Sequence, residues 1–232
     1  MHIIGIAVAI TVGASGLGAG VAKLLADRGT KVGILDLNTD LGEALARDIG
    51  ATFARCDVSD EVSAIAALDA LEAKNGVARV LVNCAGIGTA SRIVGRDGPH
   101  SLAAFEHVIR VNLIGTFNMM RLAARRMKAL EPLADGERGV IISTTSVAAF
   151  EGQIGQAAYA VSKGGIVAVT LPAAREFSKI GIRVNTIAPG LFKTPLMNEL
   201  PQEIQASLGA SIPFPSRLGS ARRKTSPGSP PR

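Results

Sequence analysis

Short apolar runs alternate along the chain with longer stretches in which apolar residues recur at helical spacing. The short runs are typical of buried strands, whereas the longer stretches are typical of amphipathic helices. Strands are predicted at Ile3–Thr11, Lys31–Asp36, Thr52–Cys56, Val80–Asn83, Gly139–Ser143 and Ile182–Ile187. Helices are predicted at Leu17–Arg28, Thr39–Ile49, Glu61–Lys74, Ser101–Leu130 and Ala157–Lys179.

The regular exchange of strands and helices predicts an α/β fold built from βαβ units. Right-handed crossovers between parallel strands give a Rossmann-like, doubly wound parallel sheet in a single domain. Ligands bind such a sheet at the carboxyl ends of its strands. The connections at 86–100 and 189–215 are long, and connections of that length are more often functional than structural.

Composition narrows the class of protein. Apolar residues make up 47% of the 232 positions, which is enough for a sizeable core. The net charge of +6 includes five basic residues among the last sixteen, and the remainder holds 20 basic and 19 acidic residues. We therefore expect no nucleic-acid-binding face. The two cysteines give no zinc or disulfide pattern, and Met1–Ile10 is too short to span a membrane, so we expect a cytoplasmic protein without a metal site or a membrane segment.

A glycine-rich turn follows the first predicted strand and precedes a helix, in the run Thr11-Val-Gly-Ala-Ser-Gly-Leu-Gly18. Such a turn lets the backbone approach a pyrophosphate, whose charge the helix N-terminus favours. Asp36 ends the second predicted strand, eighteen residues after Gly18. A carboxylate there accepts both hydroxyls of an adenosine ribose and repels a 2′-phosphate, which favours NAD over NADP. The alternative role for Asp36 is a cap of the following helix.

Tyr159 and Lys163 are four residues apart on a predicted helix and therefore share one face. A free phenol has a pKa near 10 and is a poor base at neutral pH, but a neighbouring ammonium favours the phenolate. Ser146 lies thirteen residues before Tyr159, just past the fifth strand, where its hydroxyl can hold a substrate oxygen. A Tyr and a Lys at this spacing also occur on solvated helices, but this is the only tyrosine of the chain and it follows a suitably placed serine.

Together these motifs resemble the short-chain dehydrogenase/reductase family over residues 1–219. The family opens with Thr-Gly-x-x-x-Gly-x-Gly, and here Val12 stands where the first glycine belongs. Because a β-branched residue is stiff in that turn, we expect weakened cofactor binding. The resemblance implies NAD as cofactor and, as its contacts, Thr11, Gly13, Ser15, Gly16, Leu17, Gly18, Asp36, Asp57, Val58, Asn83, Ala85, Gly86, Tyr159, Lys163, Pro189, Gly190 and Thr194.

The same resemblance implies four catalytic residues, which are Asn112, Ser146, Tyr159 and Lys163. Tyr159 would move the hydroxyl proton, and Asn112 would hold a water for proton relay to the lysine. Asp57 would contact the adenine, the turn from Asn83 to Gly86 would lie beneath it, and Thr194 would touch the nicotinamide amide.

Three further stretches resemble one subgroup of the family, the type II 3-hydroxyacyl-CoA dehydrogenases. They are Val94–His100, Gly152–Ala158 and Gly209–Arg217. The subgroup implies fatty acid metabolism, with NAD-dependent oxidation of a 3-hydroxyacyl thioester, or of another secondary alcohol, by a homotetramer. A lid over an acyl chain, or alternatively ordinary core packing, is the expected role of Leu191, Phe192, Leu196, Met197, Leu200 and Ile204.

The C-terminal residues depart from the family, which continues past Gly219 with a helix and a seventh strand. Residues 220–232 hold three prolines and no large apolar residue, and we expect a disordered basic tail. A shifted reading frame and a genuine basic tail are the two explanations.

Two other functions stay open. One is a 3-oxoacyl-carrier-protein reductase, which Asp36 opposes because those reductases generally use NADPH. The other is a truncated, catalytically impaired member of the family, which Val12 and the altered ending favour.

Overall fold

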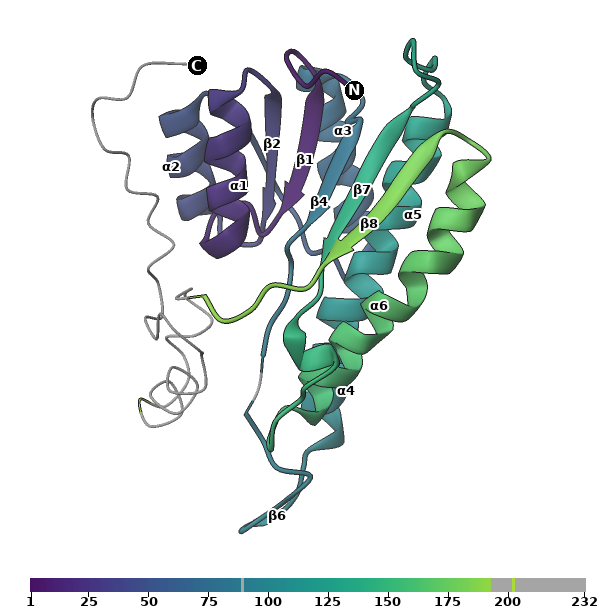
Figure 1. Cartoon of the computed structure of the whole chain (residues 1–232). Helices are drawn as coiled ribbons and strands as arrows, with labels where there is room; N and C mark the ends of the chain where they lie inside the picture. The colour runs from purple at the N-terminus through teal and green to yellow at the C-terminus, as the bar shows by residue number, and fades with distance from the viewer. Residues whose placement is uncertain (89, 193–201, 203–232) are drawn as a thin grey trace, which may run out of the picture. The chain divides into compact units, whose positions relative to one another are not determined.

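The computed structural model describes residues 1–88, 90–192 and 202. In that part of the chain six parallel strands form one sheet in the order β3-β2-β1-β4-β7-β8 (Figure 1). This order confirms the predicted Rossmann-like, doubly wound sheet. It lies within Met1–Pro189, a compact unit by its contacts, whereas residues 190–232 form a second unit. The strands are β1 Ala7–Thr11, β2 Lys31–Asp36, β3 Thr52–Arg55, β4 Val80–Asn83, β7 Gly139–Thr144 and β8 Ile182–Ile187.

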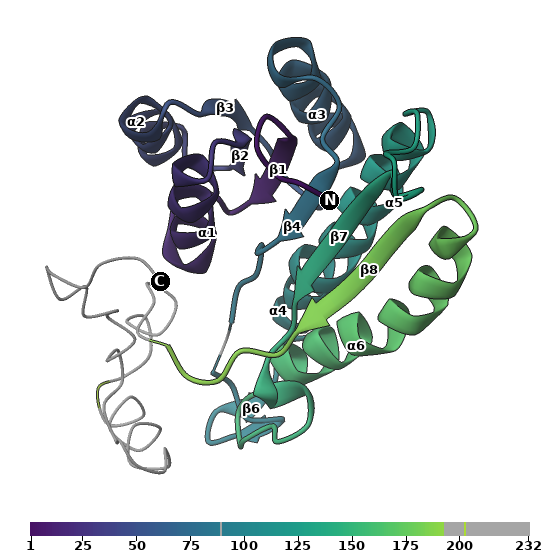
Figure 2. The same ribbon diagram turned by 45° about the horizontal axis from the view of Figure 1, so that its top comes forward.

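Helices cover both faces of the sheet, with α1 and α2 on one face and α3, α5 and α6 on the other (Figure 2). Side chains alternate between the two faces along each strand, so Ile10 and Ile34 pack toward α1 and α2 while Leu35 and Leu81 pack toward α3 and α5. The helices are α1 Gly16–Asp27, α2 Thr39–Ile49, α3 Glu61–Asn75, α4 Leu102–Ile109, α5 Gly115–Lys128 and α6 Ala157–Ser178.

The strand register brings the carboxyl ends of four strands into one row. Thr11 of β1 pairs with Asn83 of β4, Asn83 pairs with Ser143 of β7, and Ser143 pairs with Thr186 of β8. The segments that follow these strands therefore begin side by side, at the edge where doubly wound sheets bind their ligands.

Three elements differ from the predicted ones. The predicted helix Ser101–Leu130 is interrupted by a π-helical turn, η1 Arg110–Ile114, between α4 and α5. The first strand begins only at Ala7, because Gly5 adopts a positive φ of 74° in a preceding turn. The connection 86–100 contains a two-stranded ribbon of β5 Val94–Gly95 and β6 Gly98–Pro99, which the sequence pattern did not predict.

One described helix, α6, is long and apolar enough by length and composition to cross a membrane. This is weak evidence for a span, because the core helices of soluble proteins pass the same test. In the structure α6 packs along β8, and it buries Lys163 and Ile166 inside the domain.

Candidate active site

The glycine-rich turn between β1 and α1 has the backbone shape that a close approach requires. Val12 has a φ of 49° and is the one non-glycine residue at positive φ in the described part of the chain. Any side chain at Gly18 would strike the carbonyl of Val12, so α1 starts directly against the turn. Ser15 caps α1 without a side-chain hydrogen bond, and no acidic residue lies in the first helical turn. These open N–H groups fit the pyrophosphate of a dinucleotide.

Asp36 holds the turn from the neighbouring strand. Its side chain is buried, one carboxylate oxygen accepts the Ala14 N–H at 3.1 Å, and the other accepts the Asn38 N–H at 3.0 Å. The N-cap of α2 is Asn38, whose side chain accepts from Leu41 N, so Asp36 is not needed as the helix cap. Each carboxylate oxygen keeps capacity to accept a further hydrogen bond, as two ribose hydroxyls would require.

Thr11 and Asn83, which were predicted to contact the cofactor, form hydrogen bonds within the protein. The Thr11 hydroxyl is fully buried and accepts hydrogen bonds from the N–H groups of Cys84 and Ala85 at 3.0 and 3.1 Å. The Asn83 amide nitrogen donates to Ser143 Oγ at 3.3 Å. Thr11 and Asn83 thus fix the turn from Asn83 to Gly86 to the sheet, and the side chain of Thr11 contributes to a cofactor site through that turn.

Lys163 lies deep in the site, where its residue is 3% exposed. Its Nζ donates to the Thr144 carbonyl at 2.9 Å and lies 5.7 Å from the centroid of the Tyr159 ring. Burial lowers the pKa of Lys163 to about 8. A Cβ placed on Gly86 would lie 3.2 Å from Nζ and 3.5 Å from Asn112 Oδ1, so only glycine leaves this space open beside the ammonium.

The pKa of the Tyr159 phenol is shifted in the direction opposite to the predicted one. Burial raises the pKa of the Tyr159 phenol above its ordinary value, and the Ser146 hydroxyl, which favours the phenolate, offsets part of that rise. Lys163 Nζ is bonded to the Thr144 carbonyl, and Lys163 does not contribute the predicted lowering of the Tyr159 pKa.

Asn112 is fully buried in the π-helical turn η1. Its Oδ1 accepts the Ile87 N–H at 2.8 Å, and its Nδ2 donates to the Ile87 carbonyl at 2.9 Å and to Ser162 Oγ at 3.0 Å. Ser162 in turn donates to the Tyr159 carbonyl at 2.7 Å. The sequence reasoning missed Ser162, although a small polar residue in an apolar helix beside Lys163 is a signal that could have identified it.

The remaining predicted residues are placed as follows. Asp57 Oδ1 accepts from the Ser59 N–H at 2.9 Å, and Val58 is buried with its carbonyl bonded to Asn118 at 2.9 Å. The Pro189 carbonyl accepts from Val147 N at 3.3 Å. Gly190, Leu191 and Phe192 belong to the second unit. Outside the described residues lie Thr194, Leu196, Met197, Leu200, Ile204 and the tail 220–232.

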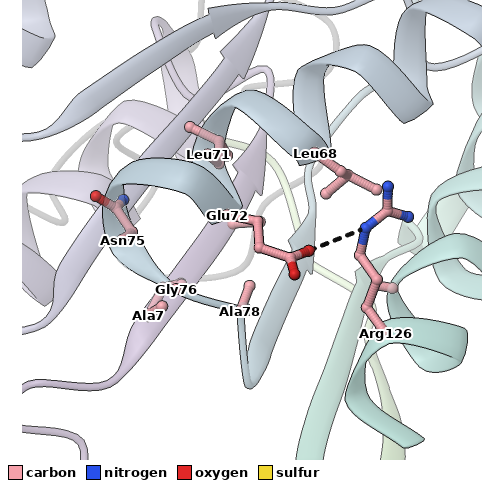
Figure 3. A pocket seen from close by; sticks show the side chains of 11 residues that line it. Ala7, Leu68, Leu71, Glu72, Asn75, Gly76, Ala78 and Arg126 are labelled. Carbon is pink, nitrogen blue, oxygen red and sulfur yellow. Dashed lines mark ion pairs between the residues drawn. The ribbon is translucent and has the colours of Figure 1, made fainter. Parts of the chain in front are cut away.

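A small cavity at the opposite end of β1 is no candidate for a ligand site. It is lined by residues of β1, α3 and α5, and its volume of about 20 Å³ is room for about one water molecule (Figure 3). Beside it Arg126 pairs with Glu72 at 3.4 Å. Within residues 1–88, 90–192 and 202, no group of three or more His, Cys, Asp or Glu side chains could hold a metal ion.

Comparison with known proteins agrees with this geometry. The family model for short chain dehydrogenases matches residues 7–205. The 3-hydroxyacyl-CoA dehydrogenases type-2 of Homo sapiens and Bos taurus are each 51% identical over 219 residues, which is 93% of this chain and 84% of theirs. The crystal structure of 3-hydroxyacyl-CoA dehydrogenase type-2 from Mycobacterium avium matches with a TM-score of 0.84 and 44% identity, covering 92% of this chain and 84% of that one. The chain therefore belongs to the short-chain dehydrogenase family and is an oxidoreductase that interconverts secondary alcohols and ketones.

Proposed function

We propose that this protein oxidises a 3-hydroxyacyl-CoA to the 3-oxoacyl-CoA with NAD, and catalyses the reverse reduction. The observation that carries the proposal is the 51% identity, over 93% of the chain, to relatives named 3-hydroxyacyl-CoA dehydrogenase type-2. The convergence of Ser146, Tyr159, Lys163 and Asn112 at the carboxyl edge of the sheet supports the chemistry.

Each side chain has a step that its position allows. The Ser146 hydroxyl holds the substrate oxygen, and Tyr159 takes the hydroxyl proton in oxidation or returns it in reduction. Lys163 supplies positive charge near the phenol, while Asn112 and Ser162 fix the helix that carries both groups. A bound nicotinamide supplies the hydride chemistry. Its dinucleotide would lie on the Val12–Gly18 turn, with the ribose at Asp36.

We further propose a cytoplasmic homo-oligomer, a tetramer as the subgroup resemblance implies. Both cysteines are free in the structure, which agrees with a reducing compartment. An open groove between α5 and α6 has a volume of about 530 Å³ and joins apolar side chains to charges of both signs. Arg125 and the acidic Glu176 line it together, so a second copy related by a two-fold axis can present Glu176 to Arg125, whereas Arg121 already pairs with Glu61 at 2.7 Å.

Steady-state kinetics with a short 3-hydroxyacyl-CoA tests the proposed reaction. We expect kcat/KM for NAD to exceed that for NADP by at least about tenfold, because Asp36 repels the 2′-phosphate. Tyr159→Phe should lose nearly all turnover and still bind NADH in a fluorescence titration. Equal use of NADP, or substantial turnover by Tyr159→Phe, would contradict the assignment of these residues, and the absence of any turnover by the parent would contradict the reaction.

A further inference from the structure

Two consecutive residues at the end of β7 hold Lys163 from opposite ends. The Thr144 carbonyl accepts a hydrogen bond from Lys163 Nζ at 2.9 Å, and the Thr145 hydroxyl donates to the Lys163 carbonyl at 2.7 Å. Thr145 and Lys163 are 4% and 3% exposed, so the bond between them lies away from solvent, and the bond to Thr144 is partly buried. The main chain and the side-chain tip of one lysine are thus fixed to the same dipeptide, one residue before Ser146.

The bond from Thr145 is not required to satisfy the helix. A carbonyl inside an α-helix already accepts the N–H of the residue four positions later, so the hydroxyl adds a second donor to the Lys163 carbonyl. Thr145 is itself anchored, because its N–H donates to the Ile187 carbonyl at the end of β8 at 2.8 Å. One buried residue therefore joins the ends of β7 and β8 to the turn of α6 that carries Lys163.

The consequence concerns the spacing of the reacting groups. Ser146 follows Thr145 directly, and Tyr159 lies one helical turn before Lys163. A hydroxyl that fixes α6 to β7 at this point also sets the distance between the Ser146 side chain and the phenol. Proton transfer is sensitive to such distances, since a misplacement of about 1 Å can cost about a hundredfold in rate.

We propose that Thr145 is a positioning residue for proton transfer, acting through Lys163. Its hydroxyl keeps the catalytic turn of α6 against the end of β7, so that Nζ stays on the Thr144 carbonyl and beside the Tyr159 ring. The inference rests on the proposed function for its kinetic consequence, but the structural coupling between Thr145 and Tyr159 can be measured without substrate.

The test compares Thr145→Val with Thr145→Ser and with a matched control. Valine keeps the shape of threonine without the hydroxyl, and serine keeps the hydroxyl. The control is Thr170→Val, which removes another hydroxyl of α6, seven residues after Lys163, that is bonded to the Ile166 carbonyl at 2.7 Å and to the Thr186 hydroxyl of β8 at 2.5 Å. If Thr145→Val does not fold, Thr145→Ala, which is smaller, replaces it.

Two readouts distinguish positioning from stability alone. We expect kcat of Thr145→Val to fall about tenfold to a hundredfold at little-changed KM, with Thr145→Ser within about threefold of the parent and Thr170→Val unchanged. The chain has one tyrosine and no tryptophan, so phenolate absorbance titrates Tyr159 alone. Its midpoint should rise in Thr145→Val, because a displaced phenol loses the Ser146 hydroxyl that favours the phenolate, and should not move in Thr170→Val.

The result that overturns the inference is a Thr145→Val protein that melts earlier, as Thr170→Val does, but keeps the parent's kcat and Tyr159 midpoint. The absorbance titration decides this even if the parent oxidises no 3-hydroxyacyl-CoA, a result that would overturn only the proposed function.

Discussion

At the scale of single residues, Val12 stands apart because a β-branched side chain occupies a left-handed backbone conformation. A positive φ costs an L-residue about 1–2 kcal/mol relative to glycine, and the stiffness of valine adds to the strain. The side chain packs partly on the core, which helps to hold this conformation. The conformation that accepts a pyrophosphate therefore competes with relaxed forms of the turn, and the apparent affinity falls in proportion to its population.

We accordingly predict that Val12→Gly tightens NADH binding by up to about tenfold, which corresponds to about 1.4 kcal/mol. Fluorescence titration of NADH measures the effect, and Val12→Ala, which keeps Cβ but removes the branch, should fall between the two. An affinity of Val12→Gly equal to that of the parent would show that the turn accepts valine without strain.

Lys163 carries a charge that the proposed chemistry needs, but its burial lowers the free energy of unfolding. Its pKa in the folded protein is lowered by burial to about 8, below the ordinary value of 10.5 in the unfolded chain. Between these pH values the unfolded state binds more protons, so the free energy of unfolding rises with pH from about 8 to 10.5. Below pH 8 the folded protein carries the full cost of a buried ammonium.

The prediction that follows is that Lys163→Met abolishes turnover but raises the melting temperature of the cofactor-free protein at pH 7. The gain is expected to be at most a few kcal/mol, since one pKa unit corresponds to about 1.4 kcal/mol and the bond to Thr144 is lost. The difference between variant and parent should shrink as the pH approaches 10. Calorimetry at both pH values measures it, and a difference independent of pH would show that Lys163 is not desolvated.

At the scale of elements, close packing between β7, α5 and β4 leaves no room for a side chain at the start of β7. A Cβ on Gly139 would lie 2.7 Å from the Arg79 carbonyl and 2.6 Å from Met127 Sδ. We predict that Gly139→Ala costs about 1–3 kcal/mol and lowers the melting temperature by several degrees, because the backbone of Arg79, directly before β4, would have to move. Gly20 in α1 has no atom within 4 Å of the same position, so Gly20→Ala should be neutral or stabilising. Equal melting points for the two variants would contradict this packing.

The sequence predicted the elements well wherever one local signal decided them. Lys31–Asp36, Val80–Asn83 and Ile182–Ile187 have the predicted bounds because a short apolar run ends at a polar residue or turn. The π-helical turn η1 could not be predicted, because no glycine or proline marks it in the sequence from Val108 to Ile114. That turn places Asn112, so the sequence named the residue through a family resemblance and not through its geometry.

Within the site, spacing along one helix predicted that Tyr159 and Lys163 share a face, but it could not predict their protonation. The pKa of each group depends on burial by segments distant in sequence, such as the end of β7. The buried hydroxyls of Thr145 and Ser162 were missed as partners for the same reason.

At the scale of the whole molecule, the groove between α5 and α6 exposes apolar side chains to solvent. This exposure is unfavourable in free energy for a monomer. Phe117, which lines the groove from α5, is 51% exposed. Arginines and Glu176 line the same groove, as a self-complementary contact between two identical copies requires. In interfaces between protein subunits, aromatic residues are enriched at the centre of the contact, where side chains are most fully removed from water.

If the proposed homo-oligomer forms through this groove, Phe117→Glu lowers the mass of the protein in solution without unfolding it. A carboxylate at the centre of the contact would have to be desolvated there, whereas on the free monomer it stays in water. Light scattering after size exclusion measures the mass, and circular dichroism verifies that the fold is kept. Val62→Glu is the control, since Val62 is 76% exposed on α3 and does not line the groove. If Phe117→Glu and Val62→Glu both retain the mass of the parent, α5 and α6 do not form the contact between subunits.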